Sequence, residues 1–127
     1  MYDIAIIGGG PAGLAAGLYG ARGGMDTVLL ENMLVGGQIT KTTQVDNYPG
    51  FPDGIDGFAI GTNMQKQAER FGLEIKRTGV DSVELEGEIK RLYCGGQGAA
   101  EADPGETVCL CGSGCADCQF QDYIHQH

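Results

Sequence analysis

The sequence predicts an α/β fold with a parallel sheet, and three observations carry that prediction. An apolar strand over residues 2–7 runs directly into a glycine-rich turn, Gly8–Gly13. A helical pattern follows from about Ala12 to Ala21, and a second apolar strand occupies 27–31. A strand, a helix and a strand in this order form a right-handed crossover unit, so the two strands are expected to be parallel.

The glycine turn predicts a dinucleotide-binding site. Gly8, Gly10 and Gly13 fill the three glycine places of the pattern G-x-G-x-x-G. They permit a tight turn, a close approach of the backbone to phosphates, and close packing of helix on strand. Glu31 ends the second strand, where an acidic residue normally binds a ribose hydroxyl. The N-terminus of the helix would add its positive dipole end.

The chain beyond the second strand alternates a long loop, a helix and short β segments. Residues 32–54 are expected to form the loop, and loops of this length are usually functional. The helix is expected from Asp56 or Gly57 to Phe71, with Gly72 as its C-terminal cap. The expected β segments are 73–76, 80–85 and 88–94, with Gly87 turning between the last two.

Composition narrows the function classes. The net charge of −9 argues against nucleic acid and anionic membranes as partners, because both are bound by clustered Lys and Arg. No apolar run reaches the length of a membrane span, and no leader precedes the first strand. We therefore expect a cytoplasmic protein with one domain in its 127 residues.

Composition changes abruptly near residue 95. All Lys and Arg residues lie at or before Arg91, and all cysteines lie at or after Cys94. We therefore divide the chain into a partial nucleotide-binding domain, 1–94, and a divergent Cys-rich tail, 95–127, expected to be irregular. Within the tail, 97–105 is expected to be a flexible loop, and 107–112 at most a degraded strand.

Three motifs resemble one family. Gly8–Gly13, Gly36–Thr40 and Val45–Phe51 follow one another at the spacing seen in low-molecular-weight thioredoxin reductases, and the resemblance covers about residues 1–94. It implies an α/β, Rossmann-like FAD-binding fold of three layers. Here that fold would be incomplete, with a small β-meander and an irregular C-terminal tail.

The resemblance also implies an FAD-dependent oxidoreductase. In that family NADPH reduces FAD, and the reduced flavin reduces a Cys-x-x-Cys disulfide that passes electrons to a thioredoxin-like disulfide protein. A homodimer is one assembly to expect. The resemblance implies that the glycine turn holds the pyrophosphate and that Glu31 binds the ribose. Gly37, Gln38 and Thr40 would lie near the flavin. Asn47 would bind the isoalloxazine ring, and the backbone of Val80 would contact the adenine. The implied cofactor-binding residues are Gly8, Gly10, Pro11, Ala12, Gly13, Glu31, Gly37, Gln38, Thr40, Asn47 and Val80.

Turn chemistry is the other explanation for Gln38 and Asn47, because Asn before Tyr-Pro-Gly is a good turn former. The sequence also departs from the family's plan, since it holds no second G-x-G-x-x-G and no closing Gly-Asp segment. We therefore expect a truncated reductase that lacks the NADPH domain. A non-catalytic nucleotide-binding module and a non-functional fragment are the alternatives. Without the closing strand, the sheet would have an open edge and an uncovered face.

The tail cysteines allow three interpretations. Cys115 and Cys118 form a Cys-x-x-Cys candidate redox pair, but no Lys or Arg in the tail would lower the pKa of a thiol there. Zinc is a second interpretation, but the spacing is crowded and we predict no metal site. The favoured interpretation is a disordered or artificial tail, such as a shifted reading frame produces. The zinc ligands would be Cys109, Cys111, Cys115 and Cys118, with His125 or His127.

Overall fold

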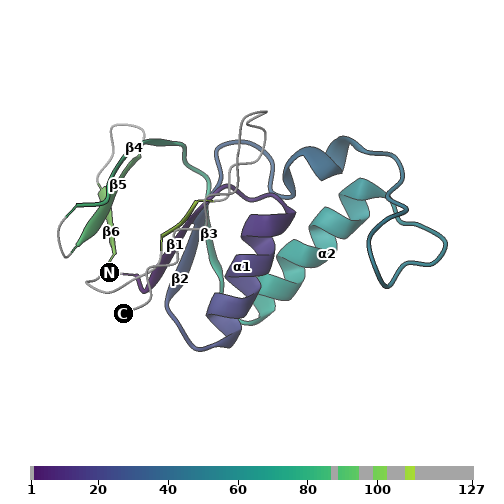
Figure 1. Cartoon of the computed structure of the whole chain (residues 1–127), viewed down its shortest axis with the longest axis horizontal. Helices are drawn as coiled ribbons and strands as arrows, with labels where there is room; N and C mark the ends of the chain where they lie inside the picture. Colours follow the sequence, from purple (N-terminus) through teal and green to yellow (C-terminus); the bar gives the residue numbers. More distant parts are fainter. Residues whose placement is uncertain (1, 87–88, 95–98, 103–107, 111–127) are drawn as a thin grey trace.

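A parallel sheet of four strands forms the centre of the molecule (Figure 1). The computed structural model describes residues 2–86, 89–94, 99–102 and 108–110. The strands are β1 (Ile4–Ile7), β2 (Thr27–Leu30), β3 (Glu74–Lys76) and β7 (Val108–Leu110), in the order β3-β2-β1-β7. β1 pairs with β2 over its whole length, from Ile4 opposite Thr27 to Ile7 opposite Leu30. The predicted crossover unit is thus confirmed.

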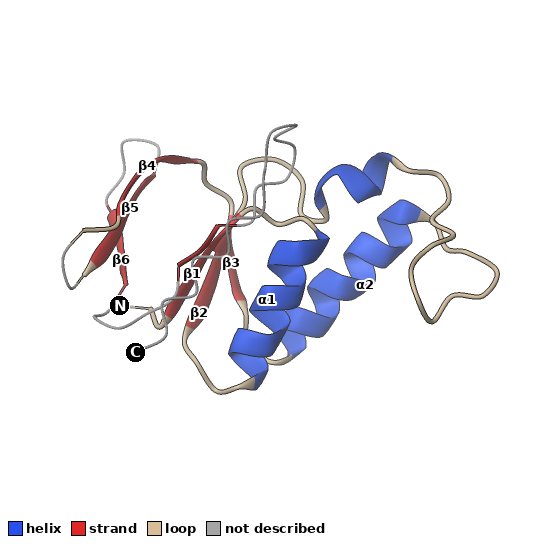
Figure 2. Ribbon diagram, viewed as in Figure 1, coloured by secondary structure: helices blue, strands red, loops and turns tan. Residues whose placement is uncertain are grey.

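Two helices, α1 (Pro11–Arg22) and α2 (Gly57–Arg70), cover one face of this sheet (Figure 2). Their core includes Leu14 from α1, Ala68 from α2 and Leu29 from β2, all nearly inaccessible to solvent. Glycines let α1 lie close to the sheet. A Cβ added at Gly20 would lie 2.8 Å from the hydroxyl of Thr27, so any side chain would push the helix outward.

A second, antiparallel sheet lies over the opposite face (Figure 1). Its strands are β4 (Val80–Glu84), β5 (Lys90–Cys94) and β6 (Ala99–Ala102), in sequence order. Leu92 and Cys94 of β5 pack against Ala5, Val28 and Leu30 of the central sheet. The predicted three-layer fold with a β-meander is confirmed. The expected uncovered face is wrong, because β5 buries it.

Two expectations about the tail are also wrong. Residues 99–102, expected to lie in a loop, form β6 and pair with β5. The Val108–Leu110 segment, expected at most as a degraded strand, forms a strand that pairs in parallel with Ala5–Ile7 and extends the sheet beyond β1. Both strands are three or four residues long, too short to show a period. Pairing with a neighbouring strand decides their conformation, and local propensity does not.

The long loop after β2 contains more structure than the sequence predicted. A 3-10 helix, η1 (Gly37–Lys41), opens within it, and an antiparallel bridge joins Val45 to Ile55 further along. Positive φ angles at Gly36 and Gly37, 107° and 65°, turn the chain into η1. None of the helices in the described part of the chain is long and apolar enough to cross a membrane.

Candidate functional site

The glycine turn between β1 and α1 has a backbone that other residues could not adopt. Gly8 has a φ of 99°, in the left-handed region that favours glycine. Its N–H donates to the Leu30 carbonyl at 2.8 Å, which ties the turn to the end of β2. A Cβ added at Gly13 would overlap the carbonyl oxygen of Gly8. The first and third glycines of the motif are therefore required by geometry.

The N-terminus of α1 suits an anion. Gly10 is the N-cap residue and supplies no side-chain hydrogen bond, and Pro11 is the first helical residue. No acidic side chain lies in the first turn. The first N–H groups of a helix have no intrahelical acceptor and carry the positive end of the helix dipole. The end of α1 therefore suits a pyrophosphate, because its first turn carries no acidic side chain that would repel the charge.

Glu31 is buried at the tip of β2, with only 6% of its surface exposed. Its Oε2 accepts the Gly9 N–H at 2.7 Å, and its Oε1 accepts the Met33 N–H at 2.8 Å. Two backbone donors thus fix the carboxylate beside the glycine turn, in the position that the sequence predicted for a ribose ligand. A carboxylate can accept about four hydrogen bonds, so this arrangement is compatible with a ribose hydroxyl as a further donor.

The loop before η1 joins the same turn. The Gly36 N–H donates to the Gly9 carbonyl at 2.6 Å, so the two polar groups of Gly9 contact Glu31 and Gly36 respectively. The Thr40 hydroxyl donates to the Gly37 carbonyl at 2.7 Å and closes the first turn of η1. The segment with Gly37, Gln38 and Thr40 therefore begins beside the dinucleotide turn, as a site shared by both motifs requires.

The N-terminus of α2 supports η1 from the other side. The carboxylate of Asp56 caps α2 by accepting the Ala59 N–H at 2.9 Å. The Gly57 N–H donates to the Thr42 carbonyl at 3.0 Å, just after η1 ends. A Cβ at Gly57 would overlap the Ile39 carbonyl oxygen. This helix end therefore lies in close backbone contact with η1 and with Thr42, the residue that follows it.

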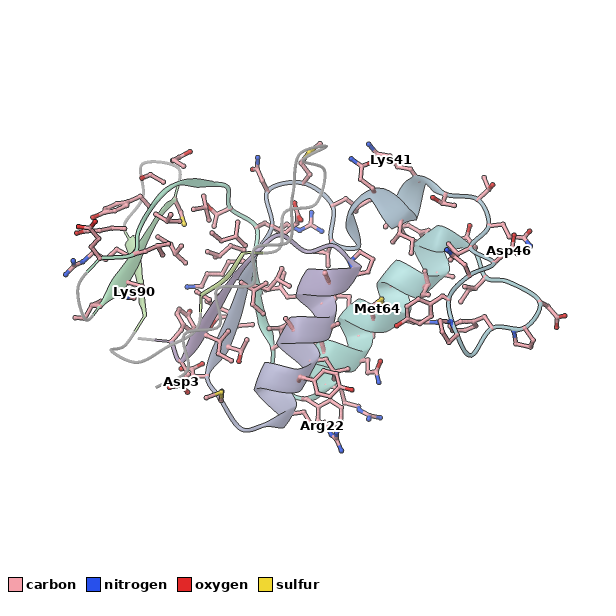
Figure 3. The ribbon with its side chains drawn as sticks, in the orientation of Figure 1. Asp3, Arg22, Lys41, Asp46, Met64 and Lys90 are labelled. Carbon is pink, nitrogen blue, oxygen red and sulfur yellow. The ribbon has the colours of Figure 1, made fainter. Side chains whose placement is uncertain are left out.

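Gln38 and Asn47 are both exposed, on η1 and in the loop that follows. Within the described residues, neither side chain has a hydrogen bond to another part of the chain. Figure 3 labels Lys41 at the end of η1 and Asp46 at the start of the next loop, both near α2. That loop is closed by two hydrogen bonds between the backbones of Val45 and Ile55, at 2.7 and 3.0 Å. Asn47 is not joined to the glycine turn by a described contact.

Val80 begins β4, close to the tip of β2. A Cβ at the preceding Gly79 would lie 3.1 Å from the side chain of Asn32, which follows Glu31. The Val80 side chain packs against the core cluster between the two sheets, and its backbone pairs with Cys94 of β5. The structure thus brings Val80 near Glu31, whereas Cys115 and Cys118 lie outside the described residues.

Sequence reasoning missed three members of this site: Gly9, Gly36 and the Met33 backbone. Gly9 fills a variable place in G-x-G-x-x-G, and its role follows from the Glu31 bond. Gly36 was visible as half of a glycine pair, but only the positive φ shows that it directs the loop. Nothing in the sequence distinguishes the Met33 N–H, because a backbone donor has no residue signature.

Cys94 is the cysteine whose side chain the structure describes, and it forms no disulfide with another described residue. It is a buried free thiol between the two sheets. Burial, followed by the negative charge of Asp81, raises the pKa of this thiol, which makes it a poor nucleophile. Among the described residues, no group of three or more His, Cys, Asp or Glu side chains could hold a metal ion.

Comparison with known proteins identifies the family. The family model for pyridine nucleotide-disulphide oxidoreductases matches residues 2–109. The chain belongs to this family. Thioredoxin reductase of Peptoclostridium acidaminophilum is 49% identical over 90 residues, which are 71% of this chain and 29% of that protein. The bifunctional thioredoxin reductase/thioredoxin of Mycobacterium leprae is 43% identical over 92 residues, 72% of this chain and 20% of that protein.

A solved structure of Lactococcus lactis thioredoxin reductase superimposes with a TM-score of 0.79 and 33% identity. The match covers 87% of this chain and 35% of that one. The resemblance to thioredoxin reductases, drawn from three motifs, is thereby confirmed, and so is the Rossmann-like fold. The chain spans about 30% of the length of the first relatives.

Proposed function

We propose that this chain is the FAD-binding portion of a thioredoxin-disulfide reductase, an enzyme that moves electrons from NADPH through flavin to a dithiol. The observation that carries the proposal is that both backbone polar groups of Gly9 are hydrogen bonded to other parts of the candidate site. Its N–H donates to Glu31 and its carbonyl accepts from Gly36, at 2.7 and 2.6 Å. The glycine turn, Glu31 and the Gly-Gly-Gln segment are thereby joined by hydrogen bonds to one residue.

The chain's own residues would divide the ligand among them. Gly8, Gly10, Pro11, Ala12 and Gly13 would hold the pyrophosphate through backbone N–H groups and the end of α1. Glu31 would accept from the ribose and the Val80 backbone would meet the adenine. Gly37, Gln38 and Thr40 would border the flavin, with Asn47 as a second amide.

Bound FAD would supply hydride acceptance and two-electron reduction of a disulfide, which takes up two protons to become two thiols. Neutral amides suit this setting, because they donate and accept hydrogen bonds without fixing a charge beside the ring. Gln38 and Asn47 are exposed and have no hydrogen-bond partner in the described part of the chain, which supports a ligand-facing role.

The finer features of the reaction are proposed on the same basis. The electron acceptor would be a thioredoxin-like disulfide protein, and the Mycobacterium leprae relative carries thioredoxin in its name. Cys115 and Cys118 are the candidate dithiol in this chain. A homodimer is the proposed assembly. We place the reaction in the cytoplasm, because dithiol reductases act where thiols are kept reduced. We also propose that the divergent region begins at residue 95.

A flavin-binding experiment tests the proposal. The purified chain is passed over a sizing column with FAD, and the visible spectrum of the protein peak is recorded. We expect a bound flavin with a shifted visible band. FMN, which has the flavin but lacks the adenosine half, should bind at least ten times more weakly if the glycine turn and Glu31 supply the main contacts. A colourless protein peak, or equal affinity for FAD and FMN, would contradict the proposal.

A non-catalytic nucleotide-binding module is the second candidate, and one observation favours it. The sequence contains a single G-x-G-x-x-G, so it offers one dinucleotide turn where the reaction needs sites for both FAD and NADPH. Anaerobic mixing of the FAD-loaded chain with NADPH separates the two. Bleaching of the flavin band indicates a reductase, whereas an unchanged band with tight FAD binding indicates a binding module.

A further inference from the structure

Both branches of the Thr40 side chain, the hydroxyl and the methyl group, contact neighbouring residues. Its hydroxyl donates to the Gly37 carbonyl at 2.7 Å. Its methyl group lies in a notch between two glycines. A Cβ added at Gly36 would lie 2.5 Å from this methyl carbon, and one added at Gly61 would lie 3.1 Å from it. A side chain fixed in this way orients the backbone around it.

The notch joins three elements of the site. Gly36 directs the loop that bonds to the dinucleotide turn, Thr40 belongs to η1, and Gly61 lies one turn into α2. A Cβ at Gly61 would lie 3.3 Å from the Cα of Gly36, so the helix and the loop are almost in backbone contact there. Gln38 lies in the sequence between Gly37 and Thr40, the two residues joined by the Thr40 hydroxyl hydrogen bond. The position of Gln38 therefore depends on this bond.

We propose that Thr40 positions Gln38 for the flavin and is not itself a flavin ligand. This inference rests on the proposed function and revises the role that the family resemblance implied for Thr40. The hydroxyl proton is donated to Gly37, and the methyl group is enclosed by Gly36 and Gly61. The hydroxyl sets the peptide that leads into Gln38, and the methyl sets the distance between η1 and α2.

Two substitutions separate these parts. Thr40→Val keeps the volume and the methyl group, but replaces the hydroxyl that donates to Gly37 with a second methyl group. Thr40→Ser keeps the hydroxyl and removes the methyl. Thr43→Val is the matched control, because Thr43 is exposed and its hydroxyl has no hydrogen-bond partner among the described residues. Each variant is prepared as the full chain.

The first measurement is amide hydrogen exchange in the chain without FAD. Thr40→Val should speed exchange at least tenfold at the amides of η1 and at Gly57, whose N–H donates to the Thr42 carbonyl. Thr40→Ser should change these rates less, and Thr43→Val should leave them unchanged. Because no ligand is present, this measurement stands even if the chain proves not to bind FAD.

The second measurement is the visible flavin band and the FAD dissociation constant. A positioning role predicts that Thr40→Val shifts the band and weakens binding together with faster exchange, and that Thr40→Ser partly restores both. Weaker FAD binding with unchanged exchange would make Thr40 a direct ligand and overturn the inference. Unchanged exchange and an unchanged band in Thr40→Val would overturn it too. A colourless wild-type protein with faster exchange in Thr40→Val would refute the flavin site but retain the positioning of η1.

Discussion

At the scale of single residues, Gly13 shows why the turn needs glycine. A Cβ at this position would overlap the Gly8 carbonyl oxygen, and that atom cannot move without breaking the turn. We expect Gly13→Ala to destabilise the fold by about 1–3 kcal/mol, as overpacking typically does, and to reduce FAD affinity at least tenfold. Isothermal titration with FAD and urea unfolding measure the two effects.

Gly24→Ala is the control for this substitution. Gly24 has a φ of 83° and open space around the Cβ position, just beyond the other end of α1. The left-handed conformation should cost about 1–2 kcal/mol with alanine, a loss similar to that of Gly13→Ala. FAD affinity should stay at the wild-type value. Equal losses of affinity in both variants would mean that general instability, and not the turn, weakens binding.

Glu31 gives a second prediction at this scale. Both carboxylate oxygens accept backbone N–H groups, from Gly9 and Met33. Glu31→Gln replaces one acceptor by an NH₂ group, so a donor would face a donor in a buried place. We expect a loss of about 1–3 kcal/mol in unfolding free energy and weaker FAD binding. Urea unfolding without FAD and titration with FAD separate these effects.

Glu86→Gln serves as the control for Glu31→Gln. Glu86 is exposed, and its carboxylate has no partner within the described residues. The same change of charge there should alter stability and FAD affinity little. If Glu31→Gln behaves like Glu86→Gln in both measurements, the carboxylate is not what holds the turn.

At the scale of elements, Asp56 links a helix cap to the site. It caps α2, and the next residue, Gly57, bonds to the Thr42 carbonyl after η1. We expect Asp56→Ala to cost about 1 kcal/mol, a usual value for a lost N-cap, and to speed amide exchange in the first turn of α2. FAD affinity should fall by a few-fold, because η1 loses part of its support. Asp56→Asn keeps a side-chain oxygen that can accept the Ala59 N–H, so it should restore both the stability and the FAD affinity. If Asp56→Asn behaves like Asp56→Ala, the capping role is contradicted.

The same scale separates what the sequence predicted from what it could not. Both helices were predicted within one or two residues, because the glycine turn and Asp56 mark their starts. η1 was missed, since its five residues are set by two positive φ angles that only glycine tolerates but that no pattern requires. β6 and β7 were missed because short strands depend on their partners.

The candidate site divides in the same way. Gly8, Gly13 and Glu31 were predictable, because a dinucleotide motif fixes their spacing. The hydrogen bond from the Gly36 N–H to the Gly9 carbonyl could not be predicted, because it is a backbone contact between residues 27 positions apart in the sequence. Asn47 was assigned by resemblance, and its exposed loop has no described contact with the turn.

At the scale of the whole molecule, ligand binding should stabilise the fold. The site is built from β1, α1, β2, η1 and the start of β4, so an unfolded chain would not offer it. FAD at about one hundred times its dissociation constant should raise the unfolding free energy by about 2.7 kcal/mol. FMN at the same concentration should raise it much less. Urea unfolding at several FAD concentrations checks this, and a midpoint independent of FAD would show that the folded chain does not bind it selectively.

The burial of Cys94 between the two sheets predicts that the stability of the fold depends on pH. Cys94 is buried there against the central sheet, and burial raises the pKa of its thiol in the folded state. As the pH rises through the ordinary thiol value of about 8.5, the unfolded chain releases this proton before the folded chain does, so the contribution of Cys94 to stability falls. Unfolding free energies are compared between wild type and Cys94→Ala under reducing conditions, at pH values on both sides of that range.

The other titrating groups are shared by the two proteins and cancel in the difference. The wild type should exceed Cys94→Ala in stability at neutral pH, because the thiol packs with Leu92 against the central sheet. This advantage should shrink as the pH rises. A constant difference over the whole range would mean that water reaches the Cys94 thiol. The second sheet would then cover the central sheet less closely than the packing of Leu92 and Cys94 against Ala5, Val28 and Leu30 requires.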